Sequence, residues 1–168
     1  MCSIHTVADA VAELCRHGFD AVGLDIAPTA VTAANEYLNS GEEDGIQGRP
    51  WKVVAEDFFK HEGEYNLIYD CTFLCALPPD LRGDWASKCA SLLSANKGQA
   101  ELVTLIFPVH DTPYEGGPPY SMSPQLVTSL LEPAGFEAIS MEEVPASELA
   151  RAKNLGGAKE FIARWRKA

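Results

Sequence analysis

The chain has 168 residues, 46% of them hydrophobic, and a formal net charge of -11 at pH 7. This length fits one domain, spanning residues 1–168, with a sizeable core. The acidic balance argues against nucleic acid or an anionic membrane as partner, since both select for clustered lysine and arginine. No apolar run approaches the ~18 residues of a membrane span, and no signal segment opens the chain. The five cysteines are scattered without CxxC pairs, so we expect neither disulfides nor a metal site, and a cytoplasmic protein.

The predicted elements alternate between helix and strand. Residues 6–16 place Val7, Val11 and Leu14 on one side, as an amphipathic helix does, and Gly18 follows where that helix would end. The alternation predicts a largely parallel sheet with helices on both faces, and the last two strands predict an antiparallel pair. After the first helix, the predicted elements in chain order are a strand at 20–25, a helix at 28–40, strands at 51–57 and 67–77, a helix at 78–94, a strand at 99–109, a helix at 124–135, and strands at 136–144 and 158–167.

Acidic side chains end three successive predicted strands. These are Asp25, Asp57 and Asp70, and Phe107 ends the fourth strand. In such sheets ligands bind outside the carboxyl ends of the strands, where an acid can accept both hydroxyls of a ribose. The carboxylate of Asp57 could accept a hydrogen bond from the amino group of an adenine, while the ring of Phe58 packs against the face of the base. For either acid alone, capping a helix or facing water is the favoured interpretation, but the two together favour a nucleoside site.

The chain resembles a known family in seven stretches that occur in the family's order. They are "GFDAVGLDIAPTAV", "EDFF", "YNLIYDCTFLCALPPDLRGDWA", "ELVTLIFPV", "EGGPPYSMS", "LLEPAGFEAI" and "GGAKEFIARWRK", and they cover nearly everything in residues 18–167. "EDFF" is weakly specific, whereas "GGPPY" after a strand ending in "FPV" is far more so. On these stretches the chain resembles the class I S-adenosylmethionine-dependent methyltransferases, specifically the thiopurine, thiol and halide methyltransferase family.

This resemblance implies a Rossmann-like sheet and methyl transfer from S-adenosylmethionine to a soft nucleophile on a small-molecule acceptor. Such a nucleophile needs no strong general base, so the protein supplies alignment and a dry pocket. The resemblance implies cofactor contacts from Asp25, Ile26, Asp57, Phe58 and Asp70, catalytic positions at Asp70, Cys71 and Thr72 beside the reactive methyl, and acceptor contacts from Phe73, Arg82, Phe107 and Tyr120.

Cys71 departs from the family pattern, since relatives usually have a tyrosine there. Free buried cysteine usually behaves as a small apolar residue, so we expect Cys71 and Cys75 to pack. Of the four histidines, we expect His110 beside the site and the other three at the surface.

A second departure concerns the glycine-rich cofactor loop. Residues 4–8, "IHTVA", lie where the family has this loop, so we expect the family's first strand to be absent from this chain. The sheet must then pair the strand of Asp25 with the strand of Asp70, borrow a strand from another chain, or leave edge groups unpaired. We expect the helix over residues 6–16 to expose its apolar side to a neighbouring chain, and hence a homo-oligomer or a partner chain that covers the gap.

Three interpretations stay open at this point. The chain could be an active small-molecule S-methyltransferase, or a relative that has lost cofactor binding and uses the pocket for another reaction or ligand. It could also be one subunit of an obligate oligomer. Fold alone does not decide among them.

Overall fold

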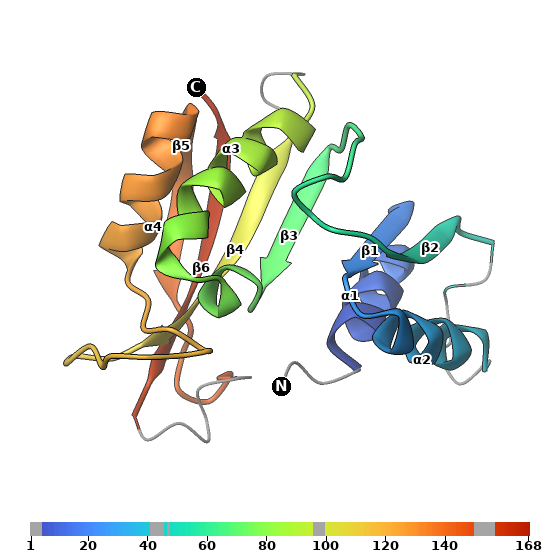
Figure 1. The fold of residues 1–168 in the computed structure, drawn as a ribbon, viewed down its shortest axis with the longest axis horizontal. Helices are drawn as coiled ribbons and strands as arrows, with labels where there is room; N and C mark the ends of the chain where they lie inside the picture. The colour runs from blue at the N-terminus through green and yellow to red at the C-terminus, as the bar shows by residue number, and fades with distance from the viewer. Residues whose placement is uncertain (1–4, 41–45, 47, 96–99, 150–156) are drawn as a thin grey trace. The chain divides into compact units, whose positions relative to one another are not determined.

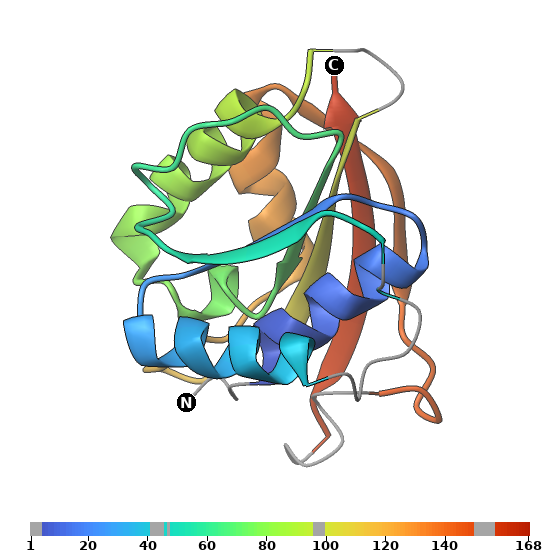
Figure 2. The same ribbon diagram turned by 90° about the vertical axis from the view of Figure 1, so that its right-hand side faces the viewer.

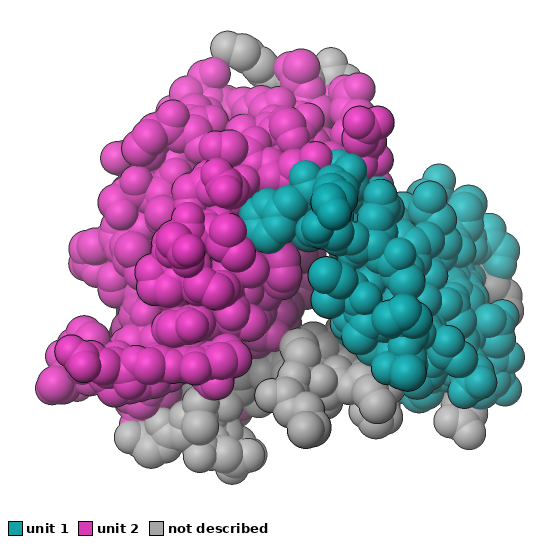
Figure 3. All heavy atoms as spheres, viewed as in Figure 1, with its two compact units in different colours: residues 1–61 teal, residues 62–168 magenta. Residues whose placement is uncertain are grey.

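The structure is a computed structural model that describes residues 5–40, 46, 48–95, 100–149 and 157–168. The chain divides into two compact units, Met1–His61 and Glu62–Ala168, which Figure 3 colours separately. The assignment of one domain to the whole chain stays a prediction.

Unit 1 contains two helices and two parallel strands (Figure 1). Its strands pair in register from Ala21 opposite Trp51 to Asp25 opposite Ala55. Because the strands are parallel, their carboxyl ends meet at one edge of this small sheet. The elements are α1 (His5–Arg16), β1 (Ala21–Asp25), α2 (Pro28–Asn39) and β2 (Trp51–Ala55), and all four lie where the sequence predicts them.

Helix α1 ends as expected at a glycine. Gly18 has a φ of 89°, a left-handed conformation that costs glycine little. Its N–H donates to the carbonyl of Cys15 at 2.9 Å, and the N–H of Phe19 donates to the carbonyl of Leu14 at 3.0 Å. These bonds satisfy two carbonyls of the last helical turn.

The apolar side of α1 is not exposed, and that expectation was wrong. Val11 is 2% exposed, and Val7 and Leu14 are partly buried against the core of unit 1. The reason is a close approach of α1 to β1 at Gly23. A Cβ atom at position 23 would lie only 2.7 Å from Cγ2 of Val7 and 3.0 Å from Cγ2 of Val11. The missing side chain lets the helix cover its own sheet. Residues 1–4 lie outside the described residues.

Unit 2 contains a four-stranded sheet in the order β3-β4-β6-β5. Strands β3 and β4 are parallel, and β6 runs antiparallel to both of its neighbours, so the predicted antiparallel pair is confirmed. Helices α3 and α4 lie on one face of this sheet (Figures 1 and 2). The elements are β3 (Leu67–Cys71), η1 (Leu74–Ala76), η2 (Pro79–Leu81), α3 (Arg82–Leu92), β4 (Glu101–Val109), α4 (Pro124–Leu131), η3 (Glu132–Ala134), β5 (Phe136–Glu143) and β6 (Lys159–Lys167).

Two tryptophans occupy the core of unit 2. Trp85 on α3 and Trp165 on β6 are both 0% exposed. The Nε1–H of Trp165 donates to Oγ1 of Thr104 on β4 at 3.0 Å, so its polar atom is satisfied within the core.

Within unit 1, β1 pairs with β2, and within unit 2, β3 pairs with β4. The Asp25 strand and the Asp70 strand belong to different units, so their direct pairing, one of the expected alternatives, stays a prediction. No strand precedes α1 within the described residues. None of the described helices is long and apolar enough to cross a lipid bilayer.

Candidate functional site

Asp25 is the last residue of β1, at the carboxyl edge of the sheet in unit 1. Its Oδ1 accepts a hydrogen bond from the N–H of Ala27 at 2.8 Å, which fixes the turn into α2. Within the described residues its second carboxylate oxygen accepts no hydrogen bond. Ile26, which follows it, is 74% exposed. Asp25 thus keeps one oxygen for a ligand.

Asp57 and Phe58 follow β2 at the same edge. Because Asp25 pairs with Ala55, Asp57 lies two residues beyond that pair. The Oδ1 of Asp57 accepts from the N–H of Phe59 at 3.0 Å, and Oδ2 lies 3.5 Å from Nζ of Lys60. The half-buried Phe58 ring meets the ring of Phe59 edge to face, with centroids 5.4 Å apart. The two acids and this ring therefore gather at one edge, as predicted.

Asp70 lies near the end of β3 in unit 2 and is buried. Its Oδ1 accepts from the N–H groups of Phe73 at 3.1 Å and Leu74 at 3.2 Å, and its Oδ2 accepts from Nε1 of Trp85 at 2.9 Å. Burial raises the pKa of Asp70 to about 6, and the three hydrogen bonds oppose that rise.

The turn after β3 has an unusual backbone. Thr72 has a φ of 71°, a left-handed conformation that is rare and strained for a β-branched residue. The Sγ of Cys75 donates to the carbonyl of Thr72 at 3.3 Å. Cys75 is 3% exposed, which confirms that it packs, and Cys71 is half-buried. Phe73 is 37% exposed.

Arg82, the first residue of α3, is buried with 6% of its surface exposed. Its guanidinium carbon lies 5.3 Å from the ring centroid of Tyr120, a cation–π arrangement. Its Nε donates to the carbonyl of Leu77 at 3.4 Å, while Nη2 is buried without a hydrogen-bond partner. Burial lowers the pKa of Arg82, but a guanidinium stays charged in proteins. Arg82 therefore presents a buried positive charge with an unused donor.

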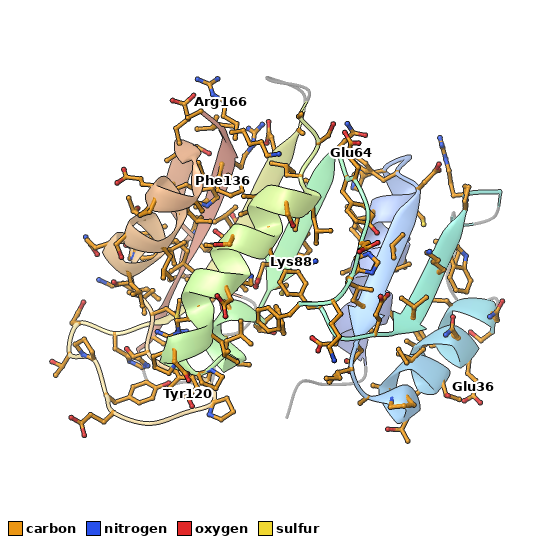
Figure 4. The ribbon with its side chains drawn as sticks, turned by 45° about the horizontal axis from the view of Figure 1, so that its top comes forward. Glu36, Glu64, Lys88, Tyr120, Phe136 and Arg166 are labelled. Atoms are coloured by element: carbon orange, nitrogen blue, oxygen red, sulfur yellow. The ribbon has the colours of Figure 1, made fainter. Side chains whose placement is uncertain are left out.

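The loop after β4 carries Tyr120, which is labelled in Figure 4. The ring of Tyr120 is the one that the guanidinium of Arg82 contacts. The N–H of Tyr120 donates to the carbonyl of Cys75 at 2.7 Å, so the loop is hydrogen-bonded to the segment that follows β3. The hydroxyl of Ser121, the next residue, is buried without a partner. Phe107 on β4 is 6% exposed and lies two residues beyond Leu105, the partner of Cys71 in the parallel ladder. The predicted acceptor-side residues thus lie at the carboxyl end of β3 and β4.

Trp85 is a residue that the sequence reasoning missed. The spacing of residues along α3 could have indicated that Trp85 is buried, because residues three and four apart share a helix face. The buried residues of α3 follow that spacing, and they are Arg82, Trp85, Ala86, Cys89 and Leu92. The same pattern would have predicted that Arg82 is buried.

The expected surface position of His61 was wrong. His61 is 5% exposed, because its backbone N–H donates to the carbonyl of Asp57 at 3.0 Å and its Nδ1 lies 2.7 Å from Oε2 of Glu56. His17 is exposed, as expected.

Unit 2 offers a buried cation with an unused hydrogen-bond donor. Both oxygens of Asp70 are occupied by N–H donors of the unit. Nη2 of Arg82 and Oγ of Ser121 are both buried without a hydrogen-bond partner. The guanidinium of Arg82 also lies over the aromatic ring of Tyr120. Such an arrangement suits an anion.

Comparison with known sequences gives a consistent result. The thiopurine S-methyltransferase family matches residues 7–167. Thiocyanate methyltransferase 1 of Brassica oleracea is 36% identical over 148 residues, which are 87% of this chain and 59% of that protein. A probable thiol methyltransferase 2 of Arabidopsis thaliana is 37% identical over 149 residues, covering 88% of this chain and 60% of that protein. The chain thus spans about three fifths of the length of these relatives.

Comparison with solved structures shows the fold. An S-adenosylmethionine-dependent methyltransferase from Methanosarcina mazei superposes with a TM-score of 0.76 at 14% identity, covering 99% of this chain and 89% of that chain. The magnesium protoporphyrin IX methyltransferase of Synechocystis, solved with bound S-adenosylhomocysteine, gives a TM-score of 0.71 at 15% identity over 98% of this chain and 71% of that chain. The expected Rossmann-like methyltransferase fold is confirmed.

Proposed function

Because this chain belongs to the thiopurine S-methyltransferase family, we propose that it transfers the methyl group of S-adenosylmethionine to a soft, anionic sulfur or halide nucleophile. The observation that supports this most is the family match, which runs through residues 7–167 and includes every predicted site residue. The relatives named above are described as thiocyanate and thiol methyltransferases, in agreement with a soft nucleophile.

The carboxyl edge of unit 1 fits the nucleoside of the donor. Asp25 has an oxygen without a partner in the described chain, positioned by the bond from Ala27 to the other oxygen. We propose that Asp25 accepts hydrogen bonds from the ribose hydroxyls, next to Ile26. Asp57 and the half-buried ring of Phe58 would hold the adenine. When bound, S-adenosylmethionine supplies an activated methyl group on a sulfonium.

The cationic site in unit 2 fits the acceptor. The unused Nη2 of Arg82 can donate to an anion, and Tyr120 holds the guanidinium in place. A thiolate, thiocyanate or halide would enter the site as an anion, so no side chain has to remove a proton from it. Phe73 and Phe107 would exclude water, which strengthens the attraction between Arg82 and the anion. The protein would act by orientation rather than by acid–base chemistry.

A methyl-transfer assay with the full chain tests this function. Labelled S-adenosylmethionine is incubated with thiocyanate, iodide, a small aromatic thiol and a neutral alcohol of similar size. We expect label in the thiocyanate, iodide or thiol products and none in the alcohol product. Label in none of them, at millimolar acceptor and micromolar enzyme, would contradict the proposal. It would then favour the reading in which the chain has lost cofactor binding.

We further propose that another chain, most simply a second copy, covers the open edges of β1 and β3. The support is that each strand has one neighbour among the described residues, and exposed strand edges tend to find partners. A cytoplasmic location is proposed on the four free cysteines at 15, 71, 75 and 89.

A further inference from the structure

Both carboxylate oxygens of Asp70 are used inside unit 2. One accepts from the backbone of Phe73 and Leu74, and the other accepts from Trp85 on α3. The side chain is 6% exposed, and each of its oxygens already accepts at least one hydrogen bond inside unit 2. The carboxylate therefore connects the end of β3 to α3.

These bonds hold a strained turn. The left-handed Thr72 lies between Asp70 and the two N–H groups that Asp70 binds. A non-glycine residue in this region is strained and persists only where its surroundings enforce it. The bonds to Phe73 and Leu74 supply that enforcement. These bonds thereby fix the backbone of Phe73, from which the exposed ring projects.

The bond to Trp85 reaches the acceptor side of the site. Trp85 lies three residues after Arg82 on the buried face of α3 and is 0% exposed. Residues three apart share a helix face, so a fixed Trp85 also fixes the end of α3 from which Arg82 projects. One carboxylate thereby joins the turn of Phe73 to the helix of Arg82.

We propose that Asp70 is a positioning residue: its ionised carboxylate holds the turn of Thr72 and Phe73 against α3, and so fixes Phe73 relative to Arg82 without touching donor or acceptor. This role rests on the proposed function, and it replaces the direct contact with cofactor and methyl that the family resemblance implies for Asp70.

The charge state of Asp70 decides how strong the three bonds are. An ionised carboxylate accepts all three as charge-assisted hydrogen bonds, whereas a protonated one is neutral and accepts them more weakly. The other groups near it are the buried thiol of Cys89, whose pKa is raised by burial and by Asp70, and the hydroxyl of Thr104, its partner across the ladder, which accepts from Trp165. No cation of the described residues pairs with Asp70. With its pKa raised to about 6, Asp70 loses its charge in mild acid, which weakens these bonds.

The test compares two buried tryptophans in the full chain. Trp85→Phe removes the indole donor from Asp70, and Trp165→Phe, the matched control, removes an equally buried donor from Thr104. Methyl transfer is measured from pH 5 to pH 8. Trp85→Phe leaves one oxygen without a donor, so we expect the acid limb of kcat to move up by half a pH unit or more. We also expect kcat to fall several-fold with the donor KM unchanged. Trp165→Phe should leave the acid limb in place.

A second measurement does not depend on activity. The indole N–H signal of Trp85 and the amide signals of Phe73 and Leu74 are followed by NMR between pH 5 and pH 8 without ligands. We expect all three to titrate together with a midpoint near 6, and Asp70→Asn to abolish the titration. Signals that do not move together would overturn the proposal, as would an acid limb that Trp85→Phe and Trp165→Phe shift equally. A joint titration in a chain without methyl transfer would instead support the bonds around Asp70 and refute the proposed function.

Discussion

The guanidinium of Arg82 lies over the ring of Tyr120, 5.3 Å from its centroid, with Nη2 buried and unpaired. A buried cation without a carboxylate partner is costly unless something compensates it. The aromatic face compensates part of this cost. The unused donor explains why an anion would bind there.

Replacing Arg82 should therefore affect the acceptor and spare the donor. A hydrogen bond to a charged group contributes about 1.5–3 kcal/mol, so Arg82→Met should raise the acceptor KM about tenfold or more. Steady-state kinetics with each substrate varied in turn measure this. Arg166→Met is the control, because Arg166 is exposed and pairs with Glu137 on the sheet surface. An equal loss of donor and acceptor affinity in Arg82→Met would show misfolding instead.

Asp25 should determine donor affinity. Asp25→Ala removes both the ribose acceptor and the bond to Ala27, and we expect the dissociation constant for S-adenosylmethionine to rise at least about tenfold. Asp20→Ala provides the control, since Asp20 is an exposed acid at the opposite end of β1. Donor binding that is unchanged in Asp25→Ala, with the fold intact by circular dichroism, would refute the assignment of Asp25.

Much of the fold was predictable because it follows from local signals. The alternation of elements and the break at Gly18 appear in the residues themselves. The burial of α1 was not predictable, since it depends on the space that Gly23 leaves for Val7 and Val11. Apolar periodicity indicates which side of a helix is buried, but it does not indicate which element that side packs against.

The candidate site residues could be proposed from the sequence, but their contacts could not. The strand ends and the family resemblance located Asp25, Asp57, Asp70 and Arg82. The second oxygen of Asp70 accepts its hydrogen bond from Trp85, which lies fifteen residues later on another element. Contacts of this kind depend on how α3 packs on β3, which no local pattern specifies.

The close approach at Gly23 predicts a stability effect. A Cβ at position 23 would lie 2.7 Å from Val7, 3.0 Å from Val11 and 3.3 Å from Val53, all within the core. Gly23→Ala should destabilise the fold by about 1–3 kcal/mol through overpacking. The control is Gly83→Ala in α3, where nothing lies within 4 Å, and it should be neutral or stabilising by up to about 1 kcal/mol. Urea denaturation of both variants checks this, and equal stability would contradict the packing described here.

The raised pKa of Asp70 leads us to expect a pH-dependent free energy of unfolding. Its pKa is raised from 3.8 to about 6 in the folded chain, so between those values the folded state binds more protons than the unfolded state. The contribution of Asp70 to the free energy of unfolding therefore falls as pH rises from about 4 to about 6, by about 3 kcal/mol, and is constant above that range. Subtracting the pH curve of Asp70→Asn from that of the unmodified chain isolates this slope. A flat difference curve would show that Asp70 titrates normally.

The open strand edges predict association. We expect a dimer or larger assembly in sedimentation experiments at micromolar concentration. A monomer of about 18 kDa, the mass of one chain, would refute the proposed covering of β1 and β3 by another copy.

Calorimetric titration of the full chain with S-adenosylmethionine and with S-adenosylhomocysteine tests the central claim most directly. The proposed site of Asp25, Asp57 and Phe58 would contact the nucleoside that both molecules share, so both should bind with one site per chain. Asp25→Ala should weaken both by a similar factor. The absence of binding heat for both ligands, at several temperatures and with the fold intact, would contradict the claim that this chain uses S-adenosylmethionine.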